Sequence, residues 1–410
     1  MVHSHDFAID YLLLILKVGF LTEPKSWRWC VCSVVPAASL LCLLFFIGSA
    51  FIATDSKENY LRFTIPDVLK STKADNCQNQ CRAPGSEPLP SGIVTTSSNL
   101  EMRPLWGVPK SVESRKSLFA MAVGINQKDM VNKMVEKFLG SDFAVMLFHY
   151  DGAVDKWSAF EWNDQVLHVS AANQTKWWFA KRFMHPDIVS EYAYVFLWDE
   201  DLGVDNFDPK RYLSIIKKEG LEISQPALDP AKSEVHHQIT ARGRRSAVHR
   251  RIYKSGGPGK GCDYASKSPP CTGWIEMMAP VFSRAAWRCV WYMIQNDLIH
   301  AWGLDIQLGY CAQGDRTENV GVVDAEYIIH HGLPTLGGSH AHNKTDSLPP
   351  QGSTAGNDTS MTPDDSQVHD PRSQVRRQSR DELTIFRTRW RNATLNDPCW
   401  VDPYPDSKFS

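Results

Sequence analysis

The chain of 410 residues is longer than a typical small domain, although length is only a soft guide to domain number. Its formal net charge is −2, whereas nucleic-acid-binding proteins generally carry an excess of basic residues, so we expect no nucleic-acid partner. Hydrophobic residues make up 43% of the chain, enough to build a sizeable core.

An apolar segment near the N-terminus predicts a membrane anchor. Residues 33–53 contain no charged side chain, and a run of about 20 such residues fits a membrane-spanning helix. Lys17, Lys25 and Arg28 precede it, so the positive-inside rule places residues 1–32 in the cytosol and the rest across the membrane. A cleaved signal sequence is the alternative. Residues 54–115 show little periodicity, which predicts a stem.

Residues 116–336 show the pattern of one folded domain. In its first part, strands are predicted at residues 118–125, 143–149, 165–169, 192–198 and 221–225, and helices at residues 128–139, 177–184 and 209–218. Asp208 is the predicted N-cap of the last of these helices, with Pro209 at its first position. This alternation predicts an α/β fold with a mostly parallel sheet flanked by helices.

The later segments are less regular. Residues 229–261 are basic and end in a Gly-rich run, which indicates either a mobile solvated loop or a groove wall that attracts phosphate or an acidic polymer. Ser283 is predicted to cap a helix through Ile294, followed by strands at residues 320–323 and 327–329. The composition of residues 337–380 predicts disorder. We expect residues 381–410 to form a short helix and tail that pack on the domain.

Two features favour a lumenal location for this domain. Asn343, Asn357 and Asn392 match the N-glycosylation acceptor pattern. Seven cysteines follow the anchor, and an oxidising lumen would permit disulfides among them. We expect Cys262 and Cys271, which bracket a Pro-rich loop, to form one pair.

An acidic cluster follows the most apolar predicted strand. Residues 192–198 lead directly into Asp199, Glu200 and Asp201. In open α/β sheets, ligands bind outside the carboxyl ends of the strands. Mg²⁺ takes one or two carboxylates and completes its shell with water and phosphate oxygens, an arrangement suited to a diphosphate. The alternative is a strand that ends in a solvated acidic turn.

Several stretches together resemble a plant family of domains of unknown function labelled "lysine-ketoglutarate reductase trans-splicing related". They are residues 122–125, 197–202, 223–229, 301–305, 330–332 and 399–404. The label implies an amino-acid reductase. The residues do not support it, because no strand leads into a Gly-x-Gly-x-x-Gly turn with a later ribose-binding acid.

The order of features also resembles a GT-A glycosyltransferase, and this resemblance implies ligands and roles. Asp199 and Asp201 would hold Mn²⁺ or Mg²⁺ against a nucleotide-sugar diphosphate, with His330 or His331 as a late ligand. Gly124 and Asn126 would contact the donor.

The same resemblance implies the residues on the acceptor side. Asp305 would be the base that takes the acceptor proton, with Glu276 as the second candidate. Trp274 and Asp229 would contact the acceptor, although burial in the core is the alternative for Trp274 and helix capping for Asp305.

We therefore expect a single-pass type II membrane protein, in the Golgi or elsewhere in the secretory pathway. It would transfer a sugar from a nucleotide-sugar donor to a glycan, with a plant cell-wall polysaccharide as the expected acceptor. A non-catalytic scaffold or glycan-binding subunit with the same pocket is the first alternative. A reductase is the second.

Overall fold

The computed structural model describes Cys77 and residues 82–98, 116–254, 261–333 and 371–404. The chain divides into two units, Met1–Gln80 and Cys81–Ser410, and every described residue except Cys77 belongs to the second. The anchor predicted at residues 33–53 lies outside the described residues. No described helix is long and apolar enough to cross a membrane.

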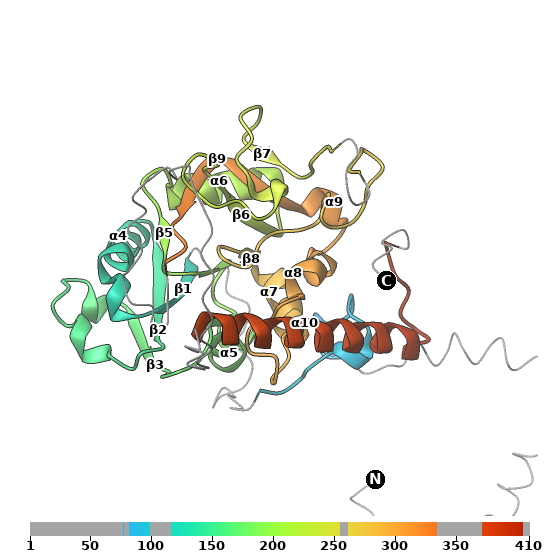
Figure 1. The fold of residues 1–410 in the computed structure, drawn as a ribbon, viewed down its shortest axis with the longest axis horizontal. Coiled ribbons are helices and arrows are strands. Elements are labelled where there is room, and N and C mark those ends of the chain that lie inside the picture. The colour runs from blue at the N-terminus through green and yellow to red at the C-terminus, as the bar shows by residue number, and fades with distance from the viewer. Residues whose placement is uncertain (1–76, 78–81, 99–115, 255–260, 334–370, 405–410) are drawn as a thin grey trace, which may run out of the picture. The chain divides into compact units, whose positions relative to one another are not determined.

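The second unit alternates strands and helices as the sequence predicts (Figure 1). Its first half contains β1 Ser117–Val123, α4 Lys128–Leu139, β2 Phe143–His149, β3 Leu167–Ser170, α5 Lys176–Phe183, β4 Tyr194–Trp198, β5 Leu202–Gly203, α6 Pro209–Glu219 and β6 Ile223–Leu228. Its second half contains β7 Val248–His249, β8 Val281–Ser283, α7 Arg284–Met293, α8 Leu304–Gln307, α9 Arg316–Asn319, β9 Val320–His330 and α10 Pro371–Asn396.

The strands form one curled, mostly parallel sheet in the order β3-β2-β1-β4-β8-β6-β9-β5, with β7 paired to β9. Strands β1 to β4 run parallel to one another, as do β6 and β9. Strand β8 is antiparallel to both of its neighbours, β4 and β6. The predicted α/β fold with a mostly parallel sheet is confirmed.

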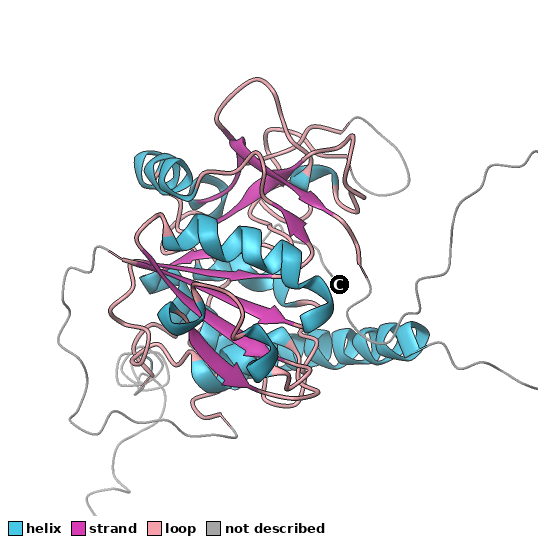
Figure 2. Cartoon of the chain, turned by 90° about the vertical axis from the view of Figure 1, so that its left-hand side faces the viewer, coloured by secondary structure: helices cyan, strands magenta, loops and turns pink. Residues whose placement is uncertain are grey.

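Helices cover both faces of the sheet (Figure 2). Successive side chains of a strand point to opposite faces, and β1 follows this rule. Leu118 and Ala120 pack in a cluster with α5, α7 and α10, whereas Phe119 and Met121 pack in a cluster with α4 and α6. Because both faces are covered, β1 and β4 consist almost entirely of apolar residues.

Helix ends follow the capping signals in the sequence. The Asp208 side chain accepts a hydrogen bond from the Arg211 backbone N–H at the start of α6, and Pro209 is the first helical residue. The Ser283 side chain accepts from the Ala286 N–H at the start of α7. Each cap satisfies a backbone donor that the helix cannot satisfy itself.

Two predicted boundaries need correction. Part of the predicted stem, residues 82–98, packs on the domain: Leu89 and Ile93 are buried, and Arg82 pairs with Asp397 at 2.8 Å. Helix α10 begins at Pro371, inside the segment predicted to be disordered, and spans 26 residues. Composition gave no sign of the order in residues 82–98, because it comes from contacts with Asp397 and other residues distant in sequence.

The predicted basic loop is partly fastened to the sheet. Three residues of β9, 324–326, have no register partner where Pro226 and Ala227 of β6 pair with Val323 and Tyr327. In this bulge the buried Asp324 carboxylate accepts from the Gly243 N–H at 2.6 Å and lies 2.8 Å from His249 Nδ1. The segment around β7 is therefore held against β9.

Candidate functional site

The acidic cluster lies at the carboxyl end of β4, in the middle of the sheet. Strand β4 is buried between β1 and β8 and is apolar up to Trp198, so the first charged side chains follow Trp198. Asp199, Glu200 and Asp201 form the turn into β5. Because β5 pairs with the end of β9, Leu202 opposite His330, the turn brings Asp201 beside His330.

Asp199 is paired with a lysine from α5. Lys176 Nζ lies 2.6 Å from Asp199 Oδ1 and also donates to the Met277 carbonyl at 2.6 Å and the Met278 carbonyl at 3.5 Å. The lysine side chain is 9% exposed, whereas that of Asp199 is 40% exposed. The Asp199 side chain is therefore the more exposed member of the pair.

Asp201 is paired with His330. Its Oδ2 lies 3.4 Å from His330 Nε2 and accepts from the Leu333 N–H at 3.0 Å. Burial opposes the charge of Asp201, but the hydrogen bond and charge of His330, together with backbone N–H groups such as that of Leu333, outweigh it and lower the pKa of Asp201. The same bond raises the pKa of His330 above its ordinary value. The side chain of His331 does not join this pair: the residue is exposed and reaches Asp201 only through its backbone N–H.

Glu276 and Asp305 lie near these pairs. Burial raises the pKa of Glu276 to about 7; nearby His330 opposes the rise, and Asp305 and Asp199 add to it. The Glu276 Oε2 atom is buried and has no hydrogen-bond partner. Asp305 Oδ2 accepts from Trp274 Nε1 at 3.3 Å, and burial raises the pKa of Asp305.

The residues assigned to the acceptor occupy different environments. Trp274 is only 3% exposed and its ring centroid lies 4.3 Å from that of His237, so it presents no open face to a sugar. The Asp229 carboxylate accepts from the Ala231 N–H at 3.0 Å, in a turn at the end of β6. Here the structure favours the core for Trp274 and a local turn for Asp229.

Sequence reasoning passed over Glu200, which faces the opposite way from its neighbours. The Glu200 Oε2 accepts from the Gly124 N–H at 2.6 Å, and its Oε1 accepts from the Tyr150 hydroxyl. A Cβ atom on Gly124 would lie 2.3 Å from the Tyr150 hydroxyl oxygen, so this position requires glycine. Asn126 is exposed two residues further on. Two residues were expected to contact the nucleotide-sugar donor. Of these, Gly124 binds Glu200 through its N–H, and Asn126 is exposed to solvent.

The carboxylates expected to hold a divalent cation have protein partners in this arrangement. Within the described ranges, no three His, Cys, Asp or Glu side chains are grouped so as to hold a metal ion. Asp199 and Asp201, the expected ligands, are instead paired with Lys176 and His330.

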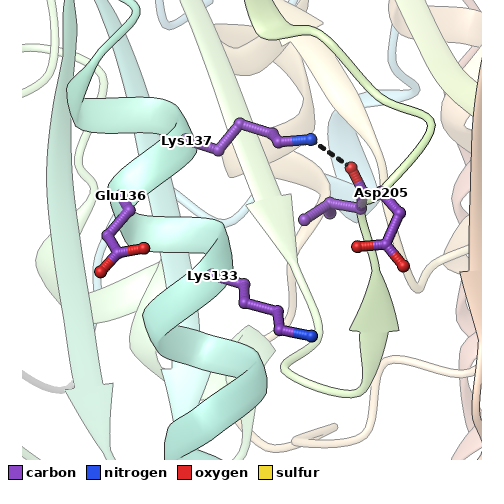
Figure 3. Close-up of a pocket in the computed structure, with 5 residues that line it drawn as sticks. Lys133, Glu136, Lys137 and Asp205 are labelled. Carbon is purple, nitrogen blue, oxygen red and sulfur yellow. Dashed lines mark hydrogen bonds between the residues drawn. The ribbon is translucent and has the colours of Figure 1, made fainter.

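A separate hollow lies between α4 and the loop that follows β5 (Figure 3). Its lining residues are Lys133, Glu136, Lys137, Val204 and Asp205. Lys137 Nζ donates to the Val204 carbonyl at 2.5 Å and so fastens α4 to this loop. Both signs of charge are present, and none of the acids of the β4 turn lines the hollow.

A known protein family matches most of this chain. Residues 80–396 match the model of a family described as protein of unknown function, DUF707. The chain belongs to this family. Among curated proteins, none matches the DUF707 chain.

Three solved structures are similar to parts of the DUF707 chain. They are TarS residues 1–349 of S. aureus (11% identity, TM-score 0.30), the bifunctional glycosyltransferase WbbM (11%, 0.28) and the mannosyltransferase Ktr4p of S. cerevisiae (7%, 0.21). The matches cover 52%, 52% and 41% of this chain, and 59%, 40% and 57% of those structures. Likenesses with TM-scores this low are no basis for assigning an activity to this chain.

The disulfides and acceptor asparagines can also be compared with the sequence. Cys262 and Cys271 form a disulfide, and so do Cys289 and Cys311, a pair that we did not predict. Asn392 is exposed on α10, whereas Asn343 and Asn357 lie outside the described residues.

Glu200 gives a testable pH dependence. Burial raises its pKa from 4.5 to about 8, with the bonds from Tyr150 and Gly124 opposing the rise. The folded protein thus holds a proton that the unfolded chain releases, so this contribution to the free energy of unfolding is complete at low pH and is lost as the pH rises to about 8. Between pH 4.5 and about 8, the free energy of unfolding of the wild type should fall by on the order of a few kcal/mol relative to that of Glu200→Gln.

Urea unfolding of both proteins at a series of pH values measures this difference. The exposed Glu161→Gln is the matched control and should show the wild-type dependence. A constant difference between wild type and Glu200→Gln across the range would show that Glu200 is ionised in the folded state.

Proposed function

We propose that this chain is a glycosyltransferase that moves a sugar from a nucleotide-sugar donor to a glycan acceptor. The observation that carries the proposal is the position of the polar cluster. The sheet order runs β3-β2-β1 in one direction and continues from β1 to β4 in the other, so the β1–β4 boundary is a switch point. Ligands of open α/β sheets bind at the carboxyl ends of strands at such a point.

The residues at this boundary suit a diphosphate-linked sugar. The turn after β1 supplies the exposed Asn126, and the turn after β4 supplies Asp199 and Asp201 with their partners Lys176 and His330. We propose that the nucleoside lies over the β1 turn and the diphosphate over the β4 turn. These positions correspond to the parts of a GT-A-like fold.

Glu276 is our candidate for the base. A general base works best when its pKa lies near the working pH and an oxygen is free to take the proton. Glu276 has a pKa of about 7 and an unpartnered Oε2, whereas Asp305 Oδ2 already accepts from Trp274. As the acceptor oxygen bonds to the anomeric carbon, the bond from that carbon to the diphosphate breaks and the acceptor proton passes to Glu276. Asp305 then serves chiefly to keep the pKa of Glu276 high.

The Glu276→Gln variant should lose activity with little change in KM. Removing a general base typically lowers kcat about 10²- to 10⁴-fold. Wild-type kcat should rise with pH around a pKa of about 7, as Glu276 loses its proton, and this limb should disappear in the variant. Release of nucleoside diphosphate from a panel of UDP- and GDP-sugars, with a glycan acceptor present, measures the rate.

Asp201→Ala should abolish the release, because it leaves His330 without its partner. Asp205→Asn is the matched control, since Asp205 is exposed four residues further along and should retain wild-type rates. A folded wild-type protein that binds glycan but turns over no nucleotide sugar would indicate the non-catalytic alternative.

We also propose that the chain is a single-pass type II membrane protein of the Golgi, or of another secretory membrane, with the domain in the lumen. The support is the uncharged run at residues 33–53 and disulfides such as Cys262–Cys271 and Cys289–Cys311, which are typical of oxidising compartments. Alkaline extraction of membranes should leave the full chain in the pellet and release a variant lacking residues 1–53. Release of both proteins would refute the anchor.

A further inference from the structure

The two acids of the β4 turn are each already paired with a basic side chain. Lys176 faces Asp199, and His330 faces Asp201. A divalent cation at these carboxylates would have to displace or repel both partners. Burying an ammonium is costly unless it is paired and hydrogen-bonded, and Lys176 meets that condition through Asp199 and the Met277 carbonyl.

Lys176 is paired with a carboxylate, and the other buried lysine of α5 is not. Lys181 is also buried on α5, but its Nζ donates only to the carbonyls of Thr95 and Trp291, both at 2.8 Å. Burial without a carboxylate lowers the pKa of Lys181 to about 6. Of these two buried lysines, Lys176 is the one joined to an acid at the end of a central strand.

Lys176 has one weakly used donor. An ammonium has three N–H donors; Lys176 makes two bonds of 2.6 Å, and its third contact, to the Met278 carbonyl, is 3.5 Å long. The third N–H could therefore turn to a phosphate oxygen, which needs donors, without breaking either short bond.

We propose that Lys176, held in place by Asp199, binds the donor diphosphate directly, so that binding and transfer need no divalent cation. This inference rests on the proposed function and reverses the role expected of Asp199, which orients a protein cation in place of a metal. During transfer, the electron pair of the breaking carbon–oxygen bond goes to the departing diphosphate. Its added charge is stabilised by the ammonium of Lys176.

Calorimetric titration of UDP and GDP into the full chain in detergent tests the proposal, with excess EDTA in one series and Mn²⁺ in the other. The nucleotide that binds should do so equally well in both series. Lys176→Met should weaken its binding about ten- to a hundredfold, the range expected for losing a charge-assisted hydrogen bond. Lys181→Met, which removes a buried lysine of the same helix away from the acids, should bind as the wild type does.

Lys176→Met leaves Asp199 unpaired and risks misfolding, so the double variant Lys176→Met/Asp199→Asn accompanies it. This variant removes both charges and should fold with a Tm near that of the wild type, yet still bind the nucleotide weakly. Binding that EDTA abolishes, or wild-type affinity in the double variant, would overturn the lysine proposal and leave the glycosyltransferase proposal standing. Failure of both nucleotides to bind in either series would overturn both.

Discussion

The site depends on one buried carboxyl group, that of Glu200, which joins the ends of β1 and β4. Its two oxygens accept from the Gly124 N–H and from the Tyr150 hydroxyl, so the turns after β1, β2 and β4 meet at one side chain. A buried polar group of this kind is costly unless its partners are in place. The turn geometry is therefore fixed before any ligand arrives, and Asp199 and Asp201 are left facing the other way.

The position of His330 has a different origin. It lies at the last residue of β9, far from the acids in sequence, and reaches Asp201 because β5 pairs with β9. The bulge at residues 324–326 of β9 places Asp324 and Glu326 in the interior, where Glu326 accepts from the Asp208 N–H at 2.7 Å. Strand β9 thus holds the basic segment through Asp324, binds the residue before α6 through Glu326 and places His330 beside Asp201.

Local patterns predicted most of the elements and few of the contacts. The bounds of α4 and β2 could be read from apolar spacing, and the caps Asp208 and Ser283 from their position, because these signals act within a few residues. The Asp199–Lys176 pair joins residues 23 apart along the chain, and a lysine in the first turn of a short helix gives no sign of its partner. Whether His330 or His331 lies beside Asp201 depends on the register in which β5 pairs with β9, which the sequence alone left open. Order in residues 82–98 arises from contacts with the end of α10 and with Asp397, which are distant in sequence, so composition gave no sign of it.

The central claim is that the carboxyl end of β4 is a diphosphate-binding site. A crystal structure of the chain with bound nucleoside diphosphate tests it most directly. The account predicts a phosphate oxygen within hydrogen-bond distance of Lys176 Nζ, with the nucleoside over the turn after β1. A diphosphate bound elsewhere on the domain, with the Lys176–Asp199 and His330–Asp201 pairs unchanged and facing solvent, would contradict it.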